Sequence, residues 1–139
     1  WLMLRSLRTL PIRLEQIGKN TQAVISFLKN HPKVERIHFP MDRDHEQHKL
    51  AQAQMSWCGG LFAAELKASA SEMETFCNNL KYFQMAVSWG GHESLVIPAI
   101  ALSAKGEQGN IPSNLVRIYV GLEESNVLIQ DLERSLELV

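Results

Sequence analysis

Residues 1–30 carry apolar side chains at helical spacing. Leucine, isoleucine and valine recur at alternating steps of three and four residues, which is the period of one face of an amphipathic helix. These positions are Leu7, Leu10, Leu14 and Ile17 and then, after Thr21 at the intervening position, Val24 and Leu28. Pro11 has no backbone N–H to donate, so it predicts a kink or a division into two helices. The run Asn30-His31-Pro32 predicts the end of the helix, because the residue before a proline avoids helical angles.

Short strands alternate with further helices after residue 30. Apolar runs predict strands at 34–39, 61–66 and 115–120, with room for a fourth short strand around Val87. Helical periodicity predicts helices at 45–55, 71–83 and 128–136. Asp44 is placed to cap the first of these helices, and Ser71 with Glu74 forms a capping box for the second. Residues 98–112, with Gly and Pro near their end, predict an irregular, mobile segment.

These elements predict an α/β fold of two layers. We expect a two-layer sandwich in which a short, mainly antiparallel sheet of three to four strands has its helices packed on one face. A chain of 139 residues forms one domain at most and can bury a hydrophobic core without disulfides or metals. Its 45% apolar and 21% charged residues are typical of a globular protein.

Charge and composition exclude several partners. The formal net charge is −1 and no cluster of Lys and Arg occurs, so neither nucleic acid nor an anionic membrane is favoured as a partner. The longest uncharged apolar run, 95–102, is far shorter than the roughly 20 residues that span a bilayer. Cys58 and Cys77 form neither a CxxC motif nor a disulfide framework, and no secretory signal opens this stretch. We therefore expect a soluble protein of the reducing cytoplasm.

Asp42, Asp44, His45 and His48 form the densest group of potential metal ligands. A zinc-protease helix needs two histidines four residues apart with a glutamate after the first, whereas this stretch reads His45-Glu46-Gln47-His48. Acidic residues near a helix start also interact favourably with the positive end of the helix dipole. The pattern therefore favours a solvated helix start over a metal site, and we expect no bound metal.

Arg117 is the residue that resists a purely structural interpretation. It lies in the middle of the apolar run 115–120, where a charged side chain is unusual. A half-buried guanidinium requires a carboxylate or phosphate partner. Spacing favours an internal acid, such as Glu93 or Glu65, and an anionic ligand is the alternative.

Four segments of the chain match a known pattern in order and spacing. They are Trp1–Leu10, His31–Arg36, Ala86–Leu95 and Leu115–Glu123. The pattern resembles the C-terminal region of the Cys/Met metabolism enzymes that depend on pyridoxal 5'-phosphate (PLP), a family that includes cystathionine synthases and lyases and methionine gamma-lyase. The resemblance implies the small C-terminal domain of a fold-type I PLP enzyme. Residues 1–30 would then be a kinked linker helix, and residues 31–139 a substrate-binding domain.

The resemblance also implies a site and a reaction class. Arg117 would bind the α-carboxylate of a small amino-acid substrate, with Ser88 and Trp89 lining the same pocket. A guanidinium suits this role because it makes two parallel bonds to a planar carboxylate. The parent would be a cytoplasmic, homotetrameric carbon–sulfur lyase or transferase of trans-sulfuration, in cysteine metabolism and methionine biosynthesis. Trp89, where many relatives carry leucine, favours the cystathionine beta-lyase branch.

The same resemblance places the PLP-binding lysine and the phosphate-binding residues upstream of this chain. The lysines present here, none of them in the matching context, are Lys19, Lys29, Lys33, Lys49, Lys67, Lys81 and Lys105. We therefore expect a C-terminal fragment that has no catalytic residue, binds no PLP and is inactive without its PLP-binding domain. Residues 97–112 depart from the family pattern, which leaves substrate specificity open. The alternative is a free-standing binding or regulatory module that recognises an anionic metabolite.

Overall fold

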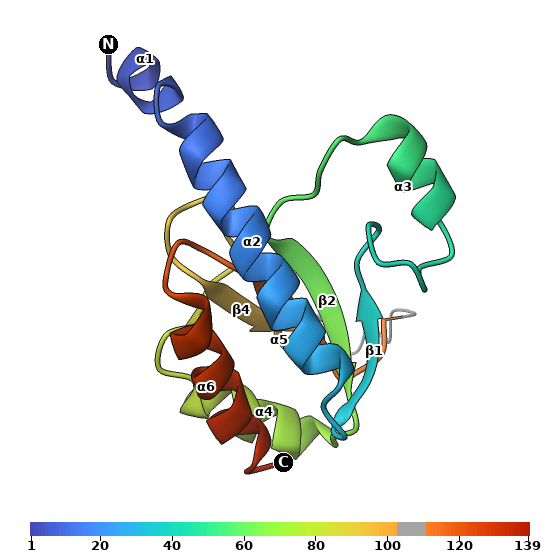
Figure 1. Ribbon diagram of the computed structural model, residues 1–139. Helices are drawn as coiled ribbons and strands as arrows, with labels where there is room; N and C mark the ends of the chain where they lie inside the picture. Colours follow the sequence, from blue (N-terminus) through green and yellow to red (C-terminus); the bar gives the residue numbers. More distant parts are fainter. Residues whose placement is uncertain (103–110) are drawn as a thin grey trace.

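The computed structural model of the protein describes residues 1–102 and 111–139. Its helices are α1 (Leu2–Leu7), α2 (Leu10–Lys29), α3 (His48–Gln54), α4 (Ala70–Asn79), α5 (Ala99–Leu102) and α6 (Ser125–Leu136). Its strands are β1 (Val34–His38), β2 (Leu61–Leu66), β3 (Gln84–Met85), β4 (Leu95–Pro98) and β5 (Leu115–Tyr119). The strands form one sheet, and α2, α4 and α6 cover one of its faces (Figure 1).

The sheet has the strand order β1-β2-β5-β4-β3. Neighbouring strands are antiparallel, except that β3 is parallel to β4. The predicted two-layer α/β fold with a mainly antiparallel sheet is confirmed. The sheet has five strands rather than three or four, however, and its short outer strand lies at 84–85 rather than around Val87. All four residues of β4 are buried, so its sequence lacks the alternation that marks a strand with one exposed face.

Alternate positions of β2 and β5 face the helices and form the core. These positions are Phe62, Ala64, Leu66, Val116 and Ile118. Buried side chains of the helices pack against them, among them Val24, Leu28, Met73, Phe76, Leu128, Leu132 and Leu136. Because successive side chains of a strand point to opposite faces, Arg117 lies on the face of the sheet away from these helices.

Pro11 divides the first helical stretch, as predicted. Helix α1 ends at Leu7, and Pro11 lies in the first turn of α2, where a missing backbone N–H costs no hydrogen bond. Helix α2 ends at Lys29, which confirms the stop signal of Asn30-His31-Pro32. The predicted strands at 34–39, 61–66 and 115–120 and the last helix are confirmed to within three residues at each boundary.

The capping box of α4 uses a different pair from the predicted one. The Ser69 hydroxyl accepts the backbone N–H of Glu72 at 3.4 Å, and the Glu72 carboxylate accepts the backbone N–H of Ser69 at 2.7 Å. Ser71 with Glu74 has the same spacing, and local sequence cannot rank two equal signals. The helix also ends at Asn79 rather than at residue 83, because the N–H groups of residues 81–83 bind a carboxylate of α6 instead of helix carbonyls.

Helix α3 is shorter than predicted and is not capped by Asp44. It begins at His48 with Gln47 as its N-cap. Asp44 instead accepts a bond from Lys29 at the end of α2, with 2.7 Å between Nζ and Oδ2. A charged partner on another element therefore outcompetes the local helix terminus, and residues 45–47 remain outside the helix.

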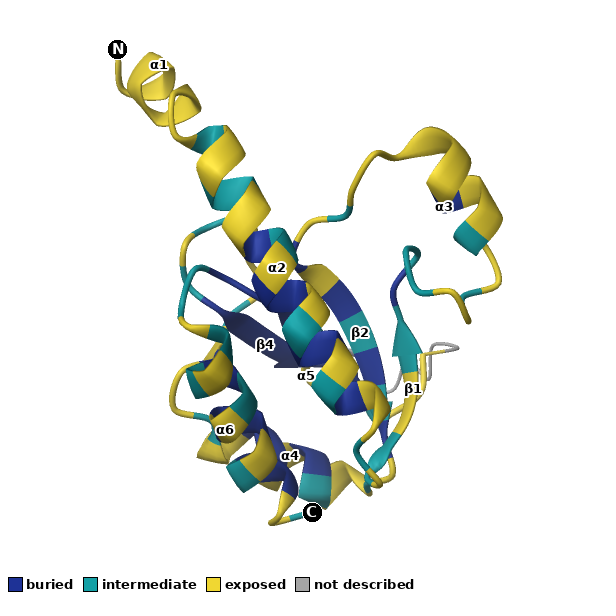
Figure 2. Cartoon of the chain, viewed as in Figure 1, coloured by how far each residue is buried: buried dark blue, intermediate teal, exposed yellow. Residues whose placement is uncertain are grey.

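Helix α1 projects beyond the sheet and buries none of its residues (Figures 1 and 2). Of the segment predicted to be irregular, residues 99–102 form the short helix α5, and residues 103–110 lie outside the described residues. Among the described helices, none combines the length and the apolar composition needed to cross a membrane.

Candidate functional site

Arg117 occupies the middle of the central strand β5. In register it lies opposite Ala63 of β2 on one side and Ile97 of β4 on the other. Its flanking residues Val116 and Ile118 are fully buried under the helices, so the backbone on both sides of Arg117 is held in place. The sheet thus fixes the backbone position of Arg117 and the face of the sheet on which its side chain lies.

The Arg117 guanidinium contacts the chain that follows β3. Its Nη2 donates to the carbonyl oxygens of Ala86 and Ser88, each at 3.5 Å, and more closely to that of Val87. The guanidinium carbon also lies 5.9 Å from the ring centroid of Trp89, a cation–π contact. The structure therefore brings the three sequence-predicted site residues together. Ser88 participates through its backbone carbonyl in these contacts rather than through its hydroxyl.

Arg117 has no carboxylate partner among the residues that the structure describes. Glu65 instead pairs with His38, with 2.5 Å between Oε1 and Nε2. Glu93 pairs with His92, with 3.1 Å between Oε2 and Nδ1. The expectation of an internal ion pair with Glu65 or Glu93 is therefore wrong, because both acids are engaged by histidines. Only neutral carbonyl groups and an indole ring face the guanidinium within this described part of the chain, so its charge is not neutralised there.

A second residue of β5, Tyr119, also bonds to the loop that carries Trp89. Gly90 has a φ of +86°, an angle that side-chain-bearing residues rarely adopt. The hydroxyl of Tyr119, two residues after Arg117, donates to the carbonyl of Gly91 at 3.0 Å. Burial and the nearby Glu93 carboxylate raise the pKa of Tyr119, so its hydroxyl keeps the proton that it donates at neutral pH.

The far end of the same loop is held by buried and partly buried polar groups that sequence reasoning missed. Glu123 accepts the backbone N–H of Ser94 at 2.8 Å and its hydroxyl at 2.7 Å. The Ser94 hydroxyl in turn accepts the backbone N–H of Gly121 at 2.8 Å. Asn20 of α2 donates to the carbonyls of Gly121 and Glu123 at 3.1 and 2.8 Å. Asn20 interrupts the buried face of α2, and that polar residue in an apolar stripe was the available signal.

Of the group Asp42, Asp44, His45 and His48, the two aspartates form ion pairs with Lys29. Lys29 donates to Asp42 and to Asp44, with 2.7 Å in each case. Burial opposes ionisation of Asp42, but its bonds from Lys29 and from backbone N–H groups outweigh burial and lower its pKa. Among the described residues, no group of three or more His, Cys, Asp or Glu side chains is arranged to hold a metal ion.

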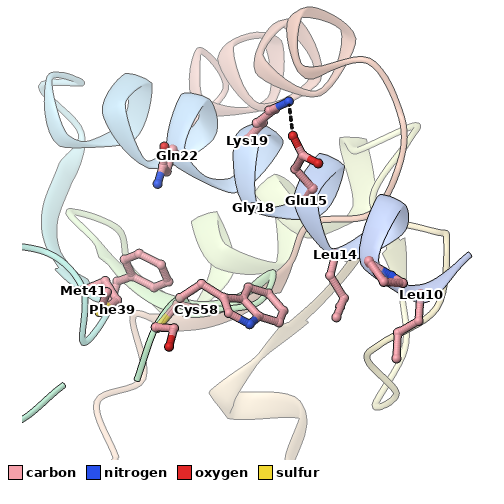
Figure 3. A pocket seen from close by; sticks show the side chains of 12 residues that line it. Leu10, Leu14, Glu15, Gly18, Lys19, Gln22, Phe39, Met41 and Cys58 are labelled. Atoms are coloured by element: carbon pink, nitrogen blue, oxygen red, sulfur yellow. Dashed lines mark hydrogen bonds and ion pairs between the residues drawn. The ribbon is translucent and has the colours of Figure 1, made fainter. Parts of the chain in front are cut away.

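The cysteines are protonated thiols rather than nucleophiles. Burial raises the pKa of Cys77 to about 12 and also raises that of Cys58. Cys58 lines a cavity of about 610 Å³ between α2 and the segments around residues 39–41 and 56–58 (Figure 3). Leu14, Phe39 and Met41 supply much of its wall, and the Lys19–Glu15 ion pair lies at its edge. None of the lining residues belongs to the Arg117 site, so this cavity is a separate feature.

The fold and the site define a class of protein domain. It is a two-layer α/β domain in which an arginine of the central strand bonds to the loop that follows an edge strand of the sheet. The model of the family described as Cys/Met metabolism PLP-dependent enzyme matches residues 1–137. The chain belongs to this family, which is the one that its sequence resembles.

Several family members are similar to the whole chain. Cystathionine gamma-lyase of Mus musculus is 38% identical over 143 residues, which cover 99% of this chain and 36% of that protein. L-methionine gamma-lyase of Fusobacterium nucleatum subsp. polymorphum is 36% identical, covering 97% of this chain and 36% of that protein. The crystal structure of cystathionine gamma synthase from Xanthomonas oryzae pv. oryzae, in complex with aminoacrylate and cysteine, has a TM-score of 0.90 at 31% identity. It matches 99% of this chain and 37% of its own. The chain thus spans little more than a third of the length of these relatives.

The described residues at Arg117 fit a carboxylate. Four lysines of the chain have defined contacts with other groups. Lys19 and Lys29 pair with acids, Lys33 donates to the carbonyls of Leu136 and Val139, and Lys67 donates to the carbonyl of Pro32.

Proposed function

We propose that this chain is the C-terminal, substrate-binding part of a PLP-dependent enzyme that acts on sulfur amino acids, and that Arg117 binds the α-carboxylate of the substrate. In this proposal residues 1–30 are the linker helix and residues 31–139 the substrate-binding domain. The observation that carries it is a partly buried guanidinium that faces neutral groups and has no carboxylate partner in the described residues. A carboxylate ligand would supply the missing negative charge.

The geometry of the guanidinium supports this role. A guanidinium has five N–H donors in a planar fork. The three carbonyl contacts all come from Nη2, so they leave the donors on Nη1 and Nε for a ligand. Two parallel charge-assisted bonds to one carboxylate would fix both its distance and its orientation. A fixed carboxylate also fixes which bond at the α-carbon faces the reacting group.

Trp89 and Ser88 are proposed as the neighbouring wall of the substrate pocket. Trp89 is 61% exposed, and its ring lies near the guanidinium on one side, so part of the residue remains open to a ligand. Ser88 contributes its carbonyl to the placement of Arg117, and its hydroxyl is available for a substrate contact. Trp89 favours the beta-lyase branch, whereas the similar proteins reported above carry gamma-lyase and gamma-synthase names.

We further propose that PLP is held by the parent portion that this chain lacks. When bound, PLP withdraws electrons from the α-carbon of the amino acid. The contribution of this chain is to bind and orient the substrate, so the PLP-binding domain is its partner in a cytoplasmic, homotetrameric parent. The free-standing module remains the alternative, and a family match over residues 1–137 gives it no support.

The test replaces Arg117 in the full-length parent enzyme. Arg117→Ala removes a bidentate, partly desolvated contact worth about 2 to 5 kcal/mol, which corresponds to a loss in kcat/KM of about thirty-fold to several-thousand-fold. Arg117→Lys should recover part of the loss, because an ammonium cannot reproduce the planar fork. PLP absorbance should be retained in both variants.

A structural role for Arg117 would give a different result. Arg117→Ala would then lower the melting temperature while turnover at a permissive temperature stayed near normal, which would refute the assignment. Analysis of the products of cystathionine with the unmodified enzyme would separate beta from gamma elimination. Homocysteine with pyruvate supports the beta-lyase branch, and cysteine with 2-oxobutyrate refutes it.

A further inference from the structure

Asp131 is a buried carboxylate of α6 that holds a distant stretch of backbone. Its residue is 1% exposed. Its Oδ1 and Oδ2 accept the N–H of Lys81 at 2.9 and 3.1 Å, and Oδ2 also accepts the N–H groups of Tyr82 at 2.8 Å and Phe83 at 3.3 Å. Arg134, three residues later on α6, lies 2.5 Å from Oδ1. One carboxylate therefore satisfies three successive N–H groups that helix α4 would otherwise have used.

The stretch bound by Asp131 leads directly into the Arg117 site. Phe83 is followed by β3, and β3 is followed by the carbonyls of residues 86–88 that accept from Arg117. Strand β3 has only two residues and lies at the edge of the sheet, where it pairs with β4 alone. Besides the pairing of β3 with β4, the N–H of Gln84 donates to the carbonyl of Ser94 at 3.0 Å, and the N–H of Ala86 donates to the carbonyl of Val96 at 3.2 Å. So short a strand defines its own register weakly.

The hydrogen bonds to Asp131 orient the peptide groups that precede β3, which the short strand does not orient by itself. Phe83 is 2% exposed, so its ring fixes how deeply the chain is buried. Hydrophobic contact is not directional, whereas three hydrogen bonds to one carboxylate determine where each peptide group points. Three residues separate Phe83 from the Val87 carbonyl, and a rotation at residue 83 would move that carbonyl away from Arg117.

We propose that Asp131 is a positioning residue for the Arg117 site. It sets the register of residues 81–86 and thereby the placement of the Ala86–Ser88 carbonyls and of Trp89 against the guanidinium. The effect of Asp131 on substrate binding rests on the proposed function of Arg117. The effect of Asp131 on the geometry of the loop is independent of that function, because it exists without a ligand.

The experiment compares Asp131→Asn with Ser135→Ala. Ser135 lies one turn later on α6, is fully buried, and donates its hydroxyl to the carbonyl of Phe76 at 2.5 Å. Both variants lose a buried hydrogen bond of the same helix, but Ser135 has no bond to residues 81–89. Trp1→Phe and Trp57→Phe in the background leave Trp89 as the sole tryptophan, since the chain has three.

The first readouts are made on the 139-residue chain without a ligand. They are amide hydrogen exchange of residues 82–88 and quenching of Trp89 fluorescence by acrylamide. In Asp131→Asn we expect exchange at these amides to rise at least tenfold relative to Ser135→Ala, with a changed Trp89 quenching constant, while amides of β2 and β5 match the control. Parallel changes in the two variants, or unchanged exchange at residues 82–88, would overturn the proposal.

A second variant covers the case in which Asp131→Asn does not fold. Asp131→Glu keeps the charge and displaces the carboxylate by one methylene, and the same local changes are expected. In the full-length parent, either variant should raise KM for the amino acid about five-fold or more with a smaller effect on kcat, whereas Ser135→Ala should alter neither. Local exchange that rises while KM is unchanged supports the positioning of the loop and contradicts the carboxylate role of Arg117. If an Asp131 variant changes KM no more than Ser135→Ala does and leaves amide exchange at residues 82–88 unchanged, Asp131 does not position the loop.

Discussion

The loop at 86–94 and helix α1 are both largely exposed, yet they are held in different ways. The loop accepts bonds from Arg117 and Tyr119 of β5, and Ser94 at its end is bound by Glu123. Helix α1 has no buried residue, and the Ser6 hydroxyl bonds within its own turn, to the carbonyl of Leu2. Exposure alone therefore does not distinguish a site from an unpartnered surface. The difference is that polar side chains of the sheet and of the segment after β5 bond to the loop, and no buried residue anchors α1.

The strongest test of how the end of the loop is held replaces Gly121, which contacts His92 and Glu123, with Gly18 of α2 as the comparison. A Cβ at Gly121 would overlap the backbone carbonyl of His92 and press on Glu123, whereas a Cβ at Gly18 of α2 would meet nothing within 4 Å. Gly121→Ala should cost about 1 to 3 kcal/mol or more, because the backbone has to move. Gly18→Ala should stabilise the chain by about 1 kcal/mol, since alanine is the better helix former. Urea unfolding measures both, and equal effects would contradict the contrast.

A smaller effect is expected from paired serine substitutions. Ser94→Ala removes the donor to Glu123 and the acceptor for Gly121, and should cost about 1 to 3 kcal/mol because buried partners lose their bonds. Ser6→Ala removes an exposed bond of α1 and should change stability by less than about 0.5 kcal/mol. Thermal unfolding of the two variants compares them directly. A loss at Ser6 as large as that at Ser94 would show that α1 is part of the cooperative fold.

The exposed apolar side of α1 is expected to drive self-association of the 139-residue chain. Trp1, Met3 and Leu4 are 85%, 76% and 69% exposed, and Leu7 continues the same side. Burying one leucine contributes about 1.5 to 3 kcal/mol, so Leu7→Glu should weaken association about tenfold or more. Sedimentation over a range of concentrations tests this. A strict monomer that Leu7→Glu leaves unchanged would contradict it, and Leu138→Glu, at the opposite end of the chain, is the control.

The smallest expected effect concerns two ion pairs and pH. The pKa of Asp42 in the folded chain lies below its ordinary value, so its bond to Lys29 stabilises fully above the unfolded pKa of about 3.9 and is lost as pH falls through the folded value. Lys29→Met should therefore lower stability by less than about 1 kcal/mol near neutral pH, with a smaller difference from the parent chain at acidic pH. Lys19→Met breaks a more exposed pair and should change stability less. A difference for Lys29→Met that grows towards low pH would contradict this sign.

Local patterns in the sequence determined most of the helices and three of the five strands. They also singled out Arg117, because a fixed charge in an apolar strand is visible without any structure. Ser88 and Trp89 became candidates through the family resemblance, since neither residue is unusual by itself. The helices, the three strands and Arg117 could be predicted because each depends on residues only a few positions apart, where periodicity carries the information.

Tertiary structure decided the features that depend on distant partners. Strand β4 is buried on both faces, so its sequence shows no alternation of apolar and polar residues that would predict a strand. Ser69 rather than Ser71 caps α4, although both serines have the required spacing to a glutamate. Glu65 also pairs with His38, so it is not the ion-pair partner of Arg117 that the sequence predicted. The bonds from Asp131 to residues 81–83 join positions about fifty apart in the chain. A sequence records which groups can bond, and only the packing of sheet and helices determines which of them meet.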